Sequence, residues 1–355
     1  MKRTILFLMF SFMGYMLFAQ DKEAAEKLIQ EGIAYHDKGD YNGAIVRYDK
    51  ALELDKDNIL ALSEKALTLQ SLKKYDESIK CCQRAIKKHP GDDCLKSVYV
   101  YYGNALDELK ETDKSIKLYD EGIKQFPDFY QLHFNKGITL WSVKKYDEAI
   151  LCFQRAISLN PKHAGSHNAI ARILNIENKR IPALLAYCRF LVIEPQTKRA
   201  KENLEFLQTI MKGSVKKTGD KEISVNITTN MLVDSTANGK TKENSFQSTD
   251  LLLAMDAALD YDAKNKNKTE VEKFIRKFDT VCASLEESQK NNYGFYWSYY
   301  APYFIEMKNK SFIETFAYIA FASSDDPAVS GWLKSHEKEI DKFYEWSKAF
   351  SWKTN

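Results

Sequence analysis

Residues 130–163 read YQLHFNKGITLWSVKKYDEAILCFQRAISLNPKH, and this 34-residue stretch sets the pattern for about half of the chain. Units of the same length occupy Ala25–Asn58 and Ile59–Asp92, and Ala164–Lys198 follows the quoted stretch. A further copy carries three extra residues near Asp93–Leu95. A fixed period of this size indicates a stacked array, in which each unit buries its apolar face on the next.

Small residues recur at two positions that lie twelve residues apart in every unit. The first position holds Gly32, Ala66, Gly103, Gly137 and Ala171, and the second holds Ala44, Ser78, Ser115, Ala149 and Ala183. Helices approach closely only where side chains are small, so these pairs predict the crossing points of helical hairpins. Four residues after the second position stand Tyr48, Cys82, Tyr119, Phe153 and Tyr187. Another small residue follows in most units, and Pro90, Pro127, Pro161 and Pro195 are expected to stop the second helix.

This succession of small, small, aromatic and small residues followed by proline resembles the tetratricopeptide repeat (TPR). The resemblance covers the chain from Ala25 to about Lys198. It implies an all-α fold, with a right-handed superhelix of about five helical hairpins. Glu31, Lys65 and Lys136 depart from the pattern, because the family usually has Leu at these places.

A change of composition beyond Pro195 divides the rest of the chain. Thr197–Lys212 is expected to be a helix that closes the array, which then spans residues 20–212. Residues 213–247 are expected to be a polar linker that ends in a loop over 234–247. Within it, apolar and polar residues alternate from Ile223 to Val233 and predict a strand, for which the sequence offers no partner.

Residues 248–355 are expected to form a mainly helical C-terminal domain. Helical spacing of apolar residues predicts helices over about 248–263, 269–288, 293–307, 312–322, stopped near Pro327, and 330–350. Residues 291–355 hold 18 aromatic residues, including four of the five tryptophans. These rings either form the core of a small domain or provide a surface for a partner or a glycan, with Trp352 expected to be the most exposed.

The amino terminus has the composition of a secretory leader. Lys2 and Arg3 precede the apolar run Ile5–Phe18, and Ala19 offers a cleavage site, so we expect residues 1–19 to be removed, with an uncleaved anchor as the alternative. Export to the periplasm or the cell envelope follows as an expectation. The net charge of +3 does not favour nucleic acid as a partner.

Signatures of catalysis and metal binding are missing from the sequence, which contains no G-x-S-x-G, H-E-x-x-H or phosphate-binding glycine loop. His163 and His167 are four residues apart, but they fall in a turn and at a packing position. The six cysteines include no CxxC pair and are expected to be mostly free thiols. We therefore expect no enzyme activity, no cofactor and no metal.

The resemblance implies that the first helices of successive units line a concave groove that binds a protein or peptide. Its expected lining is Ile29, Ile33, His36, Ser63, Leu67, Gln70, Val100, Asn104, Asp107, Phe134, Ile138, Trp141, Asn168, Arg172 and Asn175. Chaperone-binding relatives grip a C-terminal carboxylate at places that here hold Ile29, Ile33, Glu64, Ser97 and Tyr101. That clamp is absent, so an apolar or aromatic segment is the expected partner.

Three functions remain open at the level of sequence. The first is an exported adaptor that holds a partner protein in its groove, with Trp141 as the main contact. The second is binding of the cell wall or a glycan by the aromatic C-terminal domain. The third is an enzyme in the C-terminal half, against which the lack of any nucleophile, base or metal set argues.

Overall fold

The computed structural model describes residues 21–213, 215–218, 223–225 and 243–353, and the expected leader at 1–19 lies outside them. These residues form α-helices and one two-stranded sheet. After helical residues 21–37, the elements are α2 (Tyr41–Leu54), α3 (Ile59–Ser71), α4 (Tyr75–Lys88), α5 (Leu95–Glu108), α6 (Thr112–Gln125), α7 (Tyr130–Ser142), α8 (Tyr146–Leu159), α9 (Ala164–Ile176), α10 (Arg180–Ile193), α11 (Lys198–Lys212), β1 (Val215–Lys217), β2 (Ile223–Val225), α13 (Gln247–Ala258), the short 3-10 helix η2 (Leu259–Tyr261), α14 (Glu270–Ser288), α15 (Phe295–Asn309), α16 (Ile313–Ala320), α17 (Pro327–Ser335) and α18 (Glu337–Ala349).

The chain divides into two compact units, Met1–Cys152 and Phe153–Asn355. The boundary falls inside α8, whereas the sequence places domain boundaries at residues 212 and 247. Residues 153–212 share their unit with the aromatic C-terminal residues. The all-α fold with about five helical hairpins is confirmed, and the expected domain limits stay a prediction.

The turns inside the hairpins repeat the 34-residue period in their backbone geometry. Between the two helices of each hairpin, one residue has a positive φ, and these residues are Gly39, Lys73, Lys110, Lys144 and Asn178. In the second hairpin, the N–H of Lys74 donates to the carbonyl of Leu69 at 2.8 Å, and the N–H of Lys73 donates to that of Gln70 at 2.8 Å. These bonds satisfy the last carbonyls of the first helix and require a left-handed residue after it.

The predicted crossing points lie where the sequence places them. A Cβ atom on Gly32 would meet the ring of Tyr48 at 2.4 Å, and one on Gly103 would meet the ring of Tyr119 at 2.4 Å. The hydroxyl of Ser115 donates to the carbonyl of Gly103 at 2.9 Å. Two helices therefore cross in contact, with a tyrosine filling the space that the missing side chain leaves.

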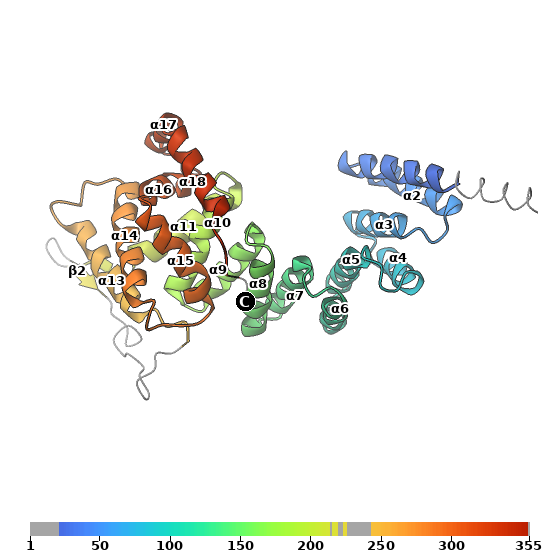
Figure 1. Cartoon of the computed structure of the whole chain (residues 1–355), viewed down its shortest axis with the longest axis horizontal. Helices are drawn as coiled ribbons and strands as arrows, with labels where there is room; N and C mark the ends of the chain where they lie inside the picture. The colour runs from blue at the N-terminus through green and yellow to red at the C-terminus, as the bar shows by residue number, and fades with distance from the viewer. Residues whose placement is uncertain (1–20, 214, 219–222, 226–242, 354–355) are drawn as a thin grey trace, which may run out of the picture. The chain divides into compact units, whose positions relative to one another are not determined.

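Neighbouring hairpins in the first unit pack in chain order (Figure 1). Helix α2 packs on α3, α4 on α5 and α6 on α7, so each second helix contacts the first helix of the next hairpin. The first helices also contact each other, α3 with α5 and α5 with α7. They form one row, which gives the first unit the helical face that the sequence analysis proposes for binding.

The three charged residues at usual Leu positions form ion pairs with the preceding or following helix. Glu31 pairs with Arg47 at 3.5 Å, and Lys136 pairs with Asp120 at 2.5 Å. Lys65 pairs with Asp49 in the same way. Ion pairs thus replace apolar contacts here. Because the acidic partners are about half exposed, each pair contributes no more than about 1 kcal/mol.

Helix α10 is the centre of the second unit. Its side chains from Ile181 to Val192 are all buried, including Arg189. It contacts α9, α11, α13, α15 and α16, and Figure 1 shows it among these helices. A helix that is apolar on every side is stable only when it is covered on every side. The closing helix α11, capped by Thr197, covers one part of it and the C-terminal helices cover the rest.

The aromatic residues of the C-terminal segment form a buried core, as one of the two sequence interpretations proposes. Among the largest fully buried side chains are Tyr299, Tyr300, Tyr303, Phe304 and Phe316. The expectation that Trp352 is the most exposed ring is wrong, because Trp352 is only partly exposed whereas Tyr293 is 55% exposed. The Trp352 ring stacks on Tyr299 at 4.6 Å and on Tyr303 at 4.9 Å between centroids, because the chain end folds back over α15.

Three local expectations need correction. The predicted strand at Ile223 does have a partner, since β2 pairs antiparallel with β1 inside the expected linker; its extension to Val233 lies outside the described residues. Pro327 does not stop a helix but begins α17, where Asp326 caps the helix and proline suits the first turn. The single helix expected over 330–350 is two helices, α17 and α18, that meet at His336.

Candidate functional site

The side chains expected to line the groove differ in how much of their surface a partner could reach. Ile29 is only 1% exposed, so it packs inside the first hairpin and departs from the expectation of a contact residue. Ser63 and Val100 are buried as well. The apolar side chains that are partly exposed on first helices are Ile33, Leu67, Phe134, Ile138 and Trp141.

Two of the polar groove residues bind the neighbouring hairpin. The ring Nδ1 of His36 lies 2.7 Å from the hydroxyl of Thr68, which belongs to the second hairpin. The amide of Gln70 donates to the carbonyl of Tyr101 in the third hairpin at 2.7 Å. These side chains connect one first helix to the next and fix the spacing of the row.

Asn104 and Asp107 are bound within their own hairpin. The phenol of Tyr119 donates to the side-chain oxygen of Asn104 at 2.6 Å. The hydroxyl of Thr112 lies 3.5 Å from a carboxylate oxygen of Asp107. Both groove residues remain partly exposed, so each keeps some surface for a partner.

Two acidic side chains, Glu64 and Asp37, interact at the amino-terminal end of the row. Burial raises the pKa of Glu64, and the nearby charge of Asp37 raises it further. The contribution of Asp37 to this shift shows that a further negative charge beside Glu64 is unfavourable. Glu64 stands where chaperone-binding relatives hold a carboxylate, so the electrostatics here disfavour a carboxylate ligand.

The three groove residues of the second unit lie on α9. Arg172 is exposed, and its guanidinium lies 5.8 Å from the centroid of the Phe206 ring on α11. Asn168 and Asn175 are partly buried. The side-chain oxygen of Asn168 accepts no hydrogen bond among the described residues, although it is buried. Because this oxygen is buried, it is not a contact point for a partner.

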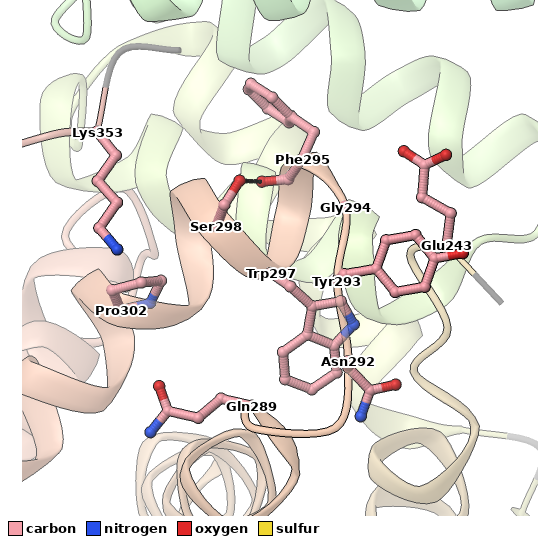
Figure 2. A pocket seen from close by; sticks show the side chains of 10 residues that line it. All are labelled: Glu243, Gln289, Asn292, Tyr293, Gly294, Phe295, Trp297, Ser298, Pro302 and Lys353. Carbon is pink, nitrogen blue, oxygen red and sulfur yellow. Dashed lines mark hydrogen bonds between the residues drawn. The ribbon is translucent and has the colours of Figure 1, made fainter. Parts of the chain in front are cut away.

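The structure also contains two cavities that the sequence analysis does not anticipate. One, of about 420 Å³, lies between α4, α5 and α6, with Ile79, Leu106 and Leu118 among its apolar lining. The other, of about 580 Å³, lies in the second unit at the start of α15 and includes Tyr293 and Trp297 (Figure 2). The aromatic composition of 291–355 is the only sequence signal that points toward the second cavity.

In the described ranges, no group of three His, Cys, Asp or Glu side chains is placed to hold a metal ion. His163 caps α9, and His167 is fully buried in packing, as the sequence predicts. Of the helices that the structure describes, none has both the length and the apolar character needed to cross a bilayer. All six cysteines fall within the described ranges and are free thiols.

Models of one repeat family match three stretches of the chain. The tetratricopeptide repeat matches residues 130–163 and 61–87, and the TPR repeat matches residues 32–73. These stretches coincide with hairpins whose turns and crossing points share the 34-residue period. The chain belongs to the tetratricopeptide repeat family.

Curated relatives of this TPR protein are similar over part of their length. Protein STIP1 homolog of Dictyostelium discoideum is 33% identical, over 35% of this chain and 28% of that protein. Hsp70-Hsp90 organizing protein of Triticum aestivum is 29% identical, over 40% of this chain and 30% of that protein. The TPR chain therefore spans less than a third of the length of these relatives.

Solved structures similar to the TPR chain include PilW, a type IV pilus biogenesis factor, and MamA. PilW is 21% identical, covers 53% of this chain and 84% of its own, and superposes with a TM-score of 0.47. MamA is 22% identical, covers 48% of this chain and 96% of its own, and superposes with a TM-score of 0.40.

Proposed function

We propose that this chain is a protein–protein interaction scaffold whose row of first helices binds a segment of a partner protein. The observation that carries the proposal is the partly exposed apolar side chains on that row, Trp141 above all. Tryptophan is one of the residues most enriched at binding hot spots, where its truncation costs about 2 kcal/mol or more.

The chemistry of the row favours an apolar or aromatic segment as the ligand. Ile33, Leu67 and Ile138 offer aliphatic surface, and Phe134 and Trp141 offer rings. The acidic pair Glu64 and Asp37 works against a carboxylate at the amino-terminal end of the row. Arg172 on α9, in the second unit, is exposed and offers a cation to a polar group of a partner.

We also propose that the protein acts after export, in the periplasm or at the cell envelope. The basic start, the short apolar run and Ala19 support this location. Mass spectrometry of the protein isolated from its native host tests the leader. A mature chain beginning at Gln20 supports export, and a chain that keeps residues 1–19 contradicts cleavage.

The groove is tested by affinity capture from a cell-envelope extract with the full chain as bait. Trp141→Ala should weaken capture of the partner about tenfold or more, because one aromatic anchor contributes roughly 2 kcal/mol to binding. The double variant Trp141→Ala with Arg172→Ala should lose the partner. Circular dichroism spectra equal to wild type ensure that the fold is intact.

Leu151→Ala is the matched control. Leu151 is an apolar residue that is 66% exposed, but it lies on α8, the second helix of its hairpin. Its replacement should leave capture unchanged. If the double variant retains every partner at full strength, or if Leu151→Ala has the same effect as Trp141→Ala, the first-helix row is not the binding face.

A further inference from the structure

A cavity of about 580 Å³ in the second unit lies beside the amino-terminal part of α15. Its volume falls within the range of about 300–1,000 Å³ that small-molecule sites occupy in proteins. Figure 2 shows Glu243 and Lys353 on opposite sides of it, with Tyr293 and Trp297 between them. None of these residues belongs to the first-helix face of the TPR hairpins.

The wall that carries Glu243 is fixed to α15 by specific contacts. The side-chain oxygen of Asn244 accepts the N–H of Tyr296 at 3.0 Å, and the indole N–H of Trp297 donates to the carbonyl of Ser245 at 2.8 Å. The rings of Trp297 and Phe246 stack with centroids 4.2 Å apart. The cavity is therefore built by bonded segments, and its shape does not depend on a loose side chain.

Glycine at position 294 permits this arrangement. Its φ is 109°, and a Cβ atom there would meet the side-chain oxygen of Asn244 at 2.4 Å. Only glycine combines this backbone conformation with so close an approach. The sequence at the rim of the cavity is thus adapted to bring Asn244 against α15.

The polar groups that line the cavity include both acceptors and donors. The side-chain amides of Asn292 and Gln289 each donate one N–H to a helix carbonyl, at 2.9 Å and 3.3 Å, which leaves the oxygen to accept and the second N–H to donate. Pro302 lies inside α15 and has no N–H to donate to the carbonyl of Ser298, one turn before it. Glu243 adds a carboxylate at the rim. The ammonium of Lys353 and the hydroxyl of Tyr293 add donors, so a ligand with groups that both donate and accept, such as hydroxyls, suits this lining.

The other residues that line the cavity provide aromatic rings and one charge of each sign. Tyr293 is 55% exposed, and Phe295 is partly exposed beside it. The ammonium of Lys353 opposes a cationic ligand, and the carboxylate of Glu243 opposes an anionic one. An uncharged ligand with many hydroxyl donors and an apolar C–H face fits both conditions, because its face can cover an aromatic ring while its hydroxyls meet the acceptors.

We propose that this cavity binds a neutral oligosaccharide, with Tyr293 as the ring on which a sugar lies and with Glu243, Asn292 and the Ser298 carbonyl as acceptors for its hydroxyls. The aromatic composition of 291–355 leaves a glycan-binding role open at the level of sequence, and this cavity gives that role a place. The proposal is independent of the partner-binding row of first helices.

Isothermal titration calorimetry on the full mature chain tests the proposal, with maltotriose and the trimer of N-acetylglucosamine as neutral probes. At least one should bind when titrated up to about 10 mM, a concentration that reveals millimolar affinity. Tyr293→Ala should weaken that binding about tenfold, the effect of losing one aromatic contact. Glu243→Gln should weaken it less, since the amide oxygen still accepts.

Tyr261→Ala is the matched control, because Tyr261 is 43% exposed and lies on η2, outside the lining of the cavity. It should bind the sugar as wild type does. Failure of both trimers to bind wild type overturns the proposal. Equal losses for the Tyr293 and Tyr261 variants overturn it as well, as does preferential binding of a charged probe such as lysine amide or glucuronate.

Discussion

The phenol of Tyr300 lies 2.7 Å from Nδ1 of His167, although 133 residues separate the two in the chain. The other ring nitrogen of His167, Nε2, lies 3.1 Å from the carbonyl of Pro161. Since a carbonyl only accepts, Nε2 carries the proton and Nδ1 accepts from Tyr300. Both nitrogens of a neutral imidazole are satisfied, which joins the last repeat to the aromatic core of the second unit.

This contact predicts that the second unit loses stability in mild acid. Burial, together with the positive charge of Arg189, lowers the pKa of His167 to about 3. An unfolded histidine takes up its proton below a pH of about 6.5, whereas the folded one does so only near 3. Between these values the unfolded state binds more protons, so the free energy of unfolding falls as pH falls, by up to about 1.4 kcal/mol per pH unit.

Urea denaturation followed by tryptophan fluorescence between pH 4 and pH 7 measures this slope. His167→Gln removes the titrating group and retains one donor and one acceptor. We expect the variant to be less stable at pH 7 and to show a weaker decline toward pH 4. Parallel pH profiles for the variant and wild type would show that other groups cause the decline.

The close crossing of α5 and α6 predicts that the stability of the protein depends strongly on the absence of a side chain at Gly103. Gly103→Ala would place its Cβ within 2.4 Å of the Tyr119 ring, so the helices must separate or the ring must move. Forcing extra atoms into a packed contact costs about 1–3 kcal/mol. Thermal unfolding monitored by circular dichroism should show the loss.

Gly331→Ala serves as the opposite case. Gly331 lies in α17, and a Cβ atom there meets nothing within 4 Å. Alanine in an exposed helix is favoured over glycine by about 1 kcal/mol, so this variant should be as stable as wild type or more so. A destabilising effect equal to that of Gly103→Ala would contradict the crossing-point explanation.

The hairpin turns predict a stabilising substitution. Lys73 has a φ of 58°, in the left-handed region where a side chain costs about 1 kcal/mol or more. Gly39 occupies the matching place in the first hairpin. Lys73→Gly should therefore raise the free energy of unfolding, as measured in urea. Lys80→Gly, an exposed change inside α4, should lower it by about 1 kcal/mol.

The end of the chain predicts a stabilising role for Trp352. The guanidinium of Arg189 lies 4.7 Å from the Trp352 ring centroid and 4.9 Å from that of Tyr303. Arg189 also donates to the hydroxyl of Tyr303 at 3.2 Å and to that of Ser347 at 3.1 Å. Because Arg189 is only 3% exposed, the aromatic rings take the place of water around a buried charge.

Trp352→Ala should lower the free energy of unfolding of the second unit by about 1–3 kcal/mol, from lost ring stacking and a cation–π contact worth up to about 2 kcal/mol when desolvated. Trp352→Phe keeps a ring over Arg189 and should recover part of the loss. Chemical denaturation compares the three proteins. Equal stability of the alanine variant and wild type would show that the chain end does not contribute.

Much of the repeat architecture could be predicted because it rests on local spacing. The contact of Gly32 with Tyr48 lies within one 34-residue unit, and the positions of both residues recur along the chain. The same spacing identified the first helices as one row. It could not reveal that Ile29 is buried or that Gln70 binds Tyr101, because these outcomes depend on how neighbouring hairpins pack.

The second unit shows where local pattern stops being informative. Pro327 can end one helix or begin another, and the capping side chain of Asp326 decides for the second outcome. The strand at Ile223 needs a partner that periodicity does not identify. The cavity beside Tyr293 joins Glu243 to Lys353, two residues far apart in the chain, and no motif links them.

The sequence by itself determined the helical hairpins, because small residues, tyrosines and turn residues recur at fixed intervals and act within single units. Only the tertiary structure decided that α10 lies at the centre of the second unit, covered by helices from the C-terminal segment. The physical reason is the distance along the chain that separates the interacting residues. The apolar sequence of α10 predicts that other elements must cover it. Which elements do so depends on shape and on hydrogen bonds between distant residues, such as that between His167 and Tyr300.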